Sequence, residues 1–140
     1  MKLFERTNIG SMELPNRIVF PPMGTQLADP GGFVNDKLIN YYNRRAEGGA
    51  GLIIVEFAAV DQQRYASARQ VHISDDKYLD GLSALAEGIR SRGAKACIQI
   101  HHPGRQNYSS VTGLQPVAPS PIPCPRIKEM PKELTANEIE

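Results

Sequence analysis

The sequence has few cysteines and no bias of charge, and both absences exclude classes of protein. Only two of its 140 residues are cysteine, and Cys97 and Cys124 form no C-x-x-C pair. This pattern predicts free thiols in a reducing compartment, so we expect a cytoplasmic protein. Lys and Arg number 16 against 15 Asp and Glu, for a formal net charge of +1. That balance gives no electrostatic reason to expect a nucleic acid or a membrane surface as partner.

Long apolar runs and phosphate-binding motifs are missing as well. No run approaches the ~20 apolar residues of a membrane span. No apolar stretch follows the first basic residue, as it would in a secretory signal. The sequence contains no G-x-G-x-x-G or P-loop pattern, and the glycine-rich residues 48–51 precede an apolar run of strand type, which counts against a Rossmann domain. No Ser/His/Asp arrangement for nucleophilic catalysis can be assembled either.

What the sequence does contain is a series of short apolar runs. Residues 17–20, 51–57 and 96–100 are predicted to be strands. The middle run shows no polar alternation, which is typical of a parallel strand buried on both faces. Residues 7–14 predict a small hairpin that turns at Gly10-Ser11 and precedes the first of these strands.

Two amphipathic segments separate the three strands. Asn35 is a predicted helix cap, and Leu38, Ile39, Tyr42 and Ala46 follow at helical spacing before two glycines end the helix. Ser74 or Asp75 can cap the second helix, whose predicted apolar stripe comprises Leu79, Leu82, Leu85, Ala86 and Ile89. Alternating strands and helices predict a parallel sheet, either open or closed as a barrel.

The loops differ in a way that favours the barrel. Loops after the strands are long and chemically rich, whereas those after the helices consist of little more than glycines, and barrel enzymes place their sites in the former. Residues 101–133 show no periodicity, and six of the eleven prolines lie between Pro116 and Pro131. A loop of that length is usually functional or a linker. Thr135 and Glu138 then form a capping box that predicts another helix.

Two motifs indicate chemistry, and each has a plainer interpretation. The first strand runs into Pro21-Pro22 and then Gly24. Either proline merely ends the strand, or a rigid turn aims backbone N–H groups at a planar cofactor that Gly24 allows to approach. Gln99, expected in a buried strand, needs both ends of its amide bonded. Either neighbouring side chains satisfy it, or it pairs with a flavin pyrimidine edge, where a carbonyl adjoins an N–H.

The His101-His102 pair raises the question of a metal. His72 or Cys97 would have to complete such a site, and no ligand spacing supports it. We therefore predict no metal site. His102 and Arg105 are instead expected to order the long loop through hydrogen bonds and ion pairs.

Taken together and in order, these motifs resemble the NADH:flavin oxidoreductases of the Old Yellow Enzyme family over essentially the whole chain. The Pro-Pro-Met-Gly-Thr form of the first motif and Gly-Arg-Gln at 104–106 are most similar to the 2-enoate and 2,4-dienoyl-CoA reductase branch. The elements that carry the resemblance are Leu3-Phe4, Leu14-Pro15-Asn16-Arg17, Pro22-Met23-Gly24-Thr25, Tyr42 with Arg45, Gly51 to Glu56, Gln99 with His102-x-Gly104-Arg105, Ala118-Pro119-Ser120, and Leu134-Thr135-x-x-Glu138-Ile139.

The resemblance implies an α/β fold, the (β/α)8 TIM barrel, of which this chain holds the first three βα units. Residues 1–140 would form the incomplete N-terminal portion of an FMN-binding barrel domain. Pro22, Met23 and Gly24 match the segment that contacts the flavin, Phe57 a position beside its ring, and Gln99 the residue bonded to its pyrimidine. Where many relatives carry Thr or Cys bonded to the flavin carbonyl, this chain has Gly24, so only neighbouring Thr25 is left to compensate.

The implied chemistry passes hydride from NAD(P)H through FMN to an activated alkene, such as an enoate or enoyl thioester. The catalytic residues are expected beyond Glu140, so residues 1–140 expressed alone should be inactive and should lack stably bound FMN. The implied partners are a small-molecule substrate and, at full length, further copies of the same chain. Whether an iron–sulfur cluster and FAD follow in other parts is left open.

Two other functions remain open at this point. A truncated, non-catalytic remnant would use its open sheet edge as an interaction module. A metal-dependent barrel hydrolase would use His101 and His102 as ligands.

Overall fold

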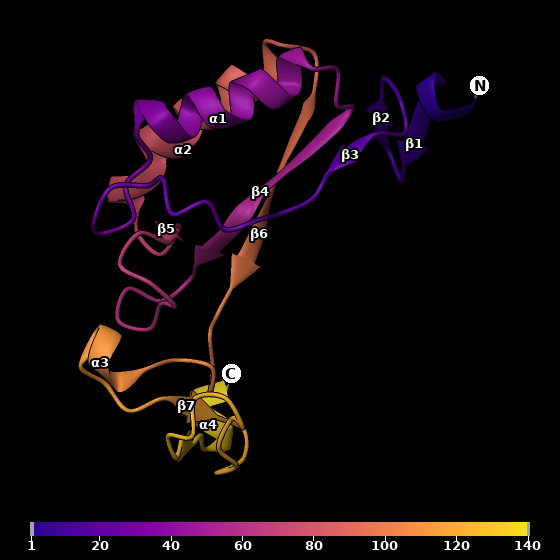
Figure 1. The fold of residues 1–140 in the computed structure, drawn as a ribbon. Helices are drawn as coiled ribbons and strands as arrows, with labels where there is room; N and C mark the ends of the chain where they lie inside the picture. Colours follow the sequence, from indigo (N-terminus) through magenta and orange to yellow (C-terminus); the bar gives the residue numbers. More distant parts are fainter. Residues whose placement is uncertain (1, 140) are drawn as a thin grey trace.

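The computed structural model describes residues 2–139, which contain a parallel sheet covered on one side by two helices (Figure 1). Its central strand is β4 (Leu52–Ala59). β6 (Lys95–His101) pairs along one edge of β4, while the short strands β3 (Val19–Phe20) and β5 (Val71–His72) pair at its two ends. All three pairings are parallel, as the sequence predicted for the first, second and third barrel strands.

Two helices of twelve residues each follow the strands and lie side by side (Figure 1). Asn35 caps α1 (Asp36–Glu47), because its Oδ1 accepts a hydrogen bond from the Leu38 N–H at 3.0 Å. A short 3₁₀ turn, η2 (Asp76–Tyr78), is capped by Asp75 and leads directly into α2 (Leu79–Arg90). Asp75 is thus the cap, and Ser74 is not.

The core lies between the sheet and these two helices. β4 has almost every residue buried, as expected for a parallel strand covered on both faces. The fully buried side chains of the core are Ala28, Leu38, Tyr42, Ile53, Ala58, Val71 and Ile89. Leu79, which was predicted to belong to the apolar stripe, is 58% exposed, because it begins α2 beyond the part of the helix that faces the sheet.

β6 is less covered than the sequence predicted. Gln99, expected in a buried strand, is exposed, and its neighbour Ile100 is 70% exposed. The reason is topological: within residues 2–139, β6 is an edge strand that pairs with β4 on one side only, so side chains on both of its faces lie at the border of the sheet. The prediction that Gln99 lies in a buried environment is therefore wrong for the described residues.

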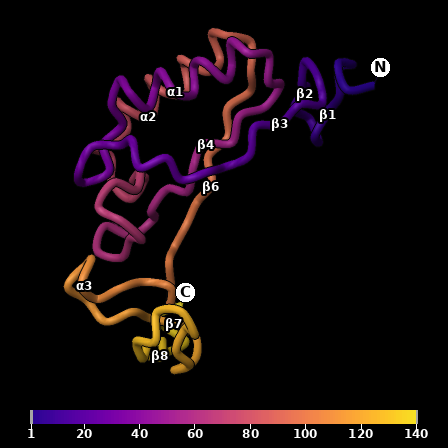
Figure 2. Tube along the Cα trace, viewed as in Figure 1, coloured from indigo at the N-terminus to yellow at the C-terminus, as the bar shows by residue number. Residues whose placement is uncertain are grey.

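Small elements flank the sheet at both ends of the chain. The predicted hairpin forms from β1 (Thr7–Ile9) and β2 (Met12–Leu14), after the 3₁₀ turn η1 (Lys2–Phe4). The proline-rich segment folds beyond the end of β6, as the trace in Figure 2 shows. That segment contains α3 (Ser109–Thr112), the parallel pair β7 (Val117–Ala118) and β8 (Lys132–Glu133), and α4 (Ala136–Ile139).

The predicted start of a helix at Thr135 is confirmed. The Thr135 N–H donates to Glu138 Oε2 at 2.9 Å, which is the half of the capping box made by the glutamate. Among the described residues, no helix is both long and apolar enough to cross a membrane.

His72 on β5 is a buried titratable group in an aromatic cluster. It is 4% exposed, stacks on Tyr78 at 5.3 Å between ring centroids, and meets Tyr65 edge-on at 5.2 Å. Burial lowers the pKa of His72, and the positive charge of Lys77 lowers it further, while Asp61 acts in the opposite direction. The imidazole is therefore neutral in the folded protein at pH 7.

Acid should destabilise the fold partly through this residue. A histidine that is neutral when folded titrates near its ordinary pKa of ~6.5 when unfolded, so the unfolded state takes up more protons below that pH. Stability should thus fall as the pH drops from about 7 to 5. We expect the thermal unfolding midpoint of His72→Phe to depend less on pH over this range than that of the wild-type protein. An equal slope for the two proteins would contradict the assignment.

Candidate functional site

A β-bulge lies near the carboxyl end of the central strand. Val55 is opposite Ile98 and Ala58 is opposite Ile100, so two residues of β4, Glu56 and Phe57, oppose the single residue Gln99 of β6. Bulges bend a strand, re-aim side chains, and are over-represented next to active sites. Here the bulge sits beside the turn that follows β3.

Phe57 packs against the turn at Gly24. A Cβ atom placed on Gly24 would collide with Cε1 of the Phe57 ring. Only glycine allows this turn to approach β4 so closely, and here the neighbour that requires it is an aromatic ring. On its other side, Phe57 meets the His101 ring edge-on at 5.1 Å between centroids. The bulge therefore brings together residues that follow or end three neighbouring strands.

Glu56, the other residue of the bulge, is a buried carboxylate with two donors. It is 1% exposed, and its Oε2 accepts hydrogen bonds from the Thr25 N–H at 3.1 Å and from the Tyr42 hydroxyl at 3.3 Å. The Tyr42 oxygen in turn accepts from the Glu56 N–H at 2.8 Å. Burial, followed by the charge of Glu56, raises the pKa of Tyr42, so the hydroxyl remains protonated and donates.

His101, at the end of β6, is held as a neutral ring. Its Nδ1 lies 3.1 Å from Nε2 of the buried Gln70, whose Oε1 accepts from the Ala66 N–H. Because that amide nitrogen donates, Nδ1 accepts and the proton of the neutral ring is on Nε2. Burial, followed by the neighbouring charge of His102, lowers the pKa of His101. The ring offers a neutral N–H donor at physiological pH.

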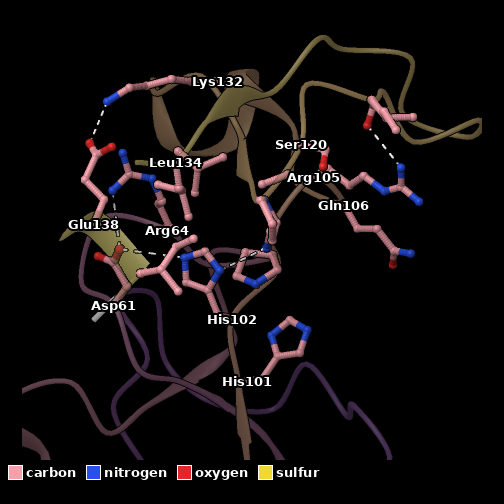
Figure 3. A pocket seen from close by; sticks show the side chains of 17 residues that line it. Asp61, Arg64, His101, His102, Arg105, Gln106, Ser120, Lys132, Leu134 and Glu138 are labelled. Carbon is pink, nitrogen blue, oxygen red and sulfur yellow. Dashed lines mark hydrogen bonds and ion pairs between the residues drawn. The ribbon is translucent and has the colours of Figure 1, made fainter. Parts of the chain in front are cut away.

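His101 also lines a cavity of about 990 Å³ that lies between the end of β6 and the proline-rich segment and has both polar and apolar walls (Figure 3). Its polar wall consists mainly of Asp61, Arg64, His102, Arg105, Lys132 and Glu138. Lys132 pairs with Glu138 at 2.7 Å, and this hydrogen bond lowers the pKa of Glu138 to about 2. This ion pair is solvent-exposed, and pairs of that kind contribute little to stability.

Two residues of this wall order the loop, as predicted. His102 Nδ1 accepts from the Gly104 N–H at 3.1 Å, while its Nε2 lies 3.9 Å from Asp61. Arg105 donates to the Ile122 carbonyl at 3.1 Å, which ties the start of the loop to its proline-rich middle. Over residues 2–139, no three side chains of His, Cys, Asp or Glu come together in a group that could hold a metal ion.

The structure thus brings the predicted cofactor residues to one edge of the sheet. Gly24 touches Phe57, Phe57 is one of the two bulge residues opposite Gln99, and Pro22 and Met23 precede Gly24 in the same turn. Thr25, the residue left to compensate for the missing side chain of Gly24, has its hydroxyl in a local turn, where it accepts from the Leu27 N–H.

The role of Glu56 was missed by sequence reasoning. The signal was available: Glu56 is the only charged residue in the apolar run 51–57, and a buried carboxylate requires partners. Its partner Tyr42 occupies the apolar face of α1, where a tyrosine hydroxyl also needs a bond.

A parallel sheet whose chemistry lies at its carboxyl edge, with helices packed on one side, defines the first part of a (β/α)8 barrel. A family model described as the NADH:flavin oxidoreductase / NADH oxidase family matches residues 2–140. The chain belongs to this family.

Known relatives agree with that assignment. The chain is 51% identical over 140 residues to an NADH oxidase of Thermoanaerobacter brockii, covering 99% of this chain and 22% of the relative. It is 42% identical over 131 residues to an NADH:acrylate oxidoreductase of Vibrio harveyi, covering 92% and 13% of the two chains. The chain therefore spans about a fifth or less of the length of these two relatives.

Solved structures show the same fold. An Old Yellow Enzyme homologue from Zymomonas mobilis superposes with a TM-score of 0.87 at 26% identity, over 99% of this chain and 41% of that one. The described residues therefore fold as the first part of an Old Yellow Enzyme type TIM barrel.

The contact between Gly24 and Phe57 can be tested by a double-mutant cycle. Gly24→Ala should destabilise the protein by about 1–3 kcal/mol, because the added methyl group overpacks against the phenyl ring. Phe57→Ala in the same chain should relieve most of this penalty. Chemical unfolding of the wild type, both single variants and the double variant measures the coupling. Additive effects would show that the ring does not impose the glycine.

Proposed function

We propose that the full-length protein is a cytoplasmic, FMN-dependent oxidoreductase that passes hydride from NAD(P)H to an activated alkene. The observation that carries this proposal is the convergence of Gly24, Phe57 and Gln99 at the carboxyl edge of the sheet. Barrel enzymes bind their ligands at this edge. Two relatives, an NADH oxidase and an NADH:acrylate oxidoreductase, support NADH as the reductant, and the second supports an activated alkene as the acceptor.

The residues present fit a flavin. Gln99 is exposed at this edge, so its carboxamide is accessible to a ligand. A carboxamide offers an N–H donor beside a carbonyl acceptor, which is complementary to the pyrimidine edge of FMN. Met23 and Gly24 add two main-chain N–H groups, and Phe57 adds an apolar ring.

FMN, when bound, would supply the transfer of hydride between the nicotinamide and the alkene. The chain's own contribution is to hold and orient that group: Gln99 at the pyrimidine edge, and the turn from Pro22 to Gly24 through its backbone. His101 offers a neutral N–H donor next to the site. The parts that would bind the substrate and deliver its proton belong to later strands of the barrel.

The purified full-length protein should be yellow and should consume NADH or NADPH only in the presence of an electron acceptor such as a 2-enoate or enoyl thioester. Flavin absorbance measures the bound cofactor, loss of nicotinamide absorbance measures consumption of the reductant, and product analysis measures reduction of the alkene. A colourless protein that assembles through its sheet edge would favour the remnant instead. One zinc per chain, lost in a His101→Ala/His102→Ala double variant, would favour the hydrolase.

Gln99 offers a sharper test of the cofactor site. Gln99→Leu should weaken FMN binding by about 1–3 kcal/mol, because polar atoms of the flavin would lose their partners. Gln99→Glu is the matched control, since it keeps the shape and the acceptor but lacks the donor. Titration of FMN into apoprotein and the flavin reduction potential provide the readouts. Unchanged affinity and potential in Gln99→Leu would refute the assignment.

A further inference from the structure

We propose that Glu56 is a positioning residue that fixes the turn from Pro22 to Thr25 against β4, and so holds the backbone that faces the cofactor. The inference rests on the proposed function for the identity of that cofactor. The contact itself is independent of it: the Thr25 N–H donates to Glu56 Oε2 at 3.1 Å.

The turn has few other anchors. Pro21 and Pro22 have no N–H, so Met23, Gly24 and Thr25 supply the only main-chain donors of this segment. Within residues 2–139, the bond from Thr25 to Glu56 is the one hydrogen bond that ties any of these three donors to the chain. Once Thr25 is held, the N–H groups of Met23 and Gly24 remain available to a ligand.

The anchor itself is rigid. Glu56 is 1% exposed and Tyr42 is fully buried, and the two form a reciprocal pair in which each donates to the other. A buried carboxylate with two donors is restricted in position, because losing either bond leaves charge desolvated and unsatisfied. The pair therefore links α1, β4 and the turn.

The bulge couples this anchor to the aromatic ring. Glu56 and Phe57 are adjacent in the bulge, with Glu56 bonded to the turn at Thr25 and Phe57 in contact with it at Gly24. The hydrogen bond of Glu56 and the packing contact of Phe57 thus hold two consecutive residues, Thr25 and Gly24.

The test compares variants of the full-length protein that separate the two hydrogen bonds donated to the Glu56 carboxylate, one by the Thr25 N–H and one by the Tyr42 hydroxyl. Glu56→Leu should weaken FMN binding about tenfold and accelerate amide hydrogen exchange at Thr25, because the turn loses its anchor. Glu56→Gln, whose amide oxygen still accepts both bonds, should restore most of the affinity. Tyr42→Phe, which removes only the other donor, should lower the unfolding temperature and weaken FMN binding clearly less than Glu56→Leu does, because the bond from Thr25 to Glu56 remains.

A double variant guards against simple misfolding. Glu56→Leu/Tyr42→Phe removes both polar side chains of the buried pair, so no hydroxyl or carboxylate is left unpaired and only the backbone N–H groups of residues 25 and 56 lose their acceptors, yet it should bind FMN as weakly as Glu56→Leu. The proposal is overturned if Glu56→Leu keeps wild-type FMN affinity and Thr25 exchange, or if Tyr42→Phe weakens FMN equally. Should the wild-type protein bind no FMN, the proposed function fails, while exchange at Thr25 still decides whether Glu56 positions the turn.

Discussion

The bulge in β4 is the constraint on which the candidate site depends. By inserting one extra residue opposite Gln99, it separates two neighbouring side chains that serve different purposes: Glu56 bonds to the Tyr42 hydroxyl and the Thr25 amide, and Phe57 packs on Gly24. An unbroken strand places successive side chains on opposite faces, so it could not direct both toward the same turn. The site is therefore a consequence of one irregularity in an otherwise regular parallel sheet.

Burial is distributed unevenly across that sheet. β4 is enclosed by strands at both edges and by α1 and α2, whereas β6 has a partner on only one edge within residues 2–139. The exposed Gln99 and Ile100 follow from this arrangement. In a complete barrel of this family, further strands would pair with β6 and enclose its inward side. The unpaired edge of β6 is thus the edge along which the next strand of such a barrel would pair.

Local signals predicted the elements well where a single residue has a single physical role. Asn35 caps α1 because its side chain reaches the Leu38 N–H, and Asp75, one of two predicted candidates, caps the turn before α2. The position of Leu79 was wrong because helical periodicity does not reveal which part of a helix extends past its partner. Short pairings such as that of β7 with β8 left no signal, since two-residue strands have no periodicity to detect.

The sequence by itself determined the order of the three main strands and the two long helices, their parallel pairing and the family, because apolar periodicity, caps and motifs are properties of neighbouring residues. It also named the residues that meet at the carboxyl edge. Only the tertiary structure revealed that Glu56 holds the turn, that the Phe57 ring requires Gly24, and that Gln99 is exposed. These facts depend on contacts between residues more than thirty positions apart and on which strand lies at an edge, and no local pattern encodes either.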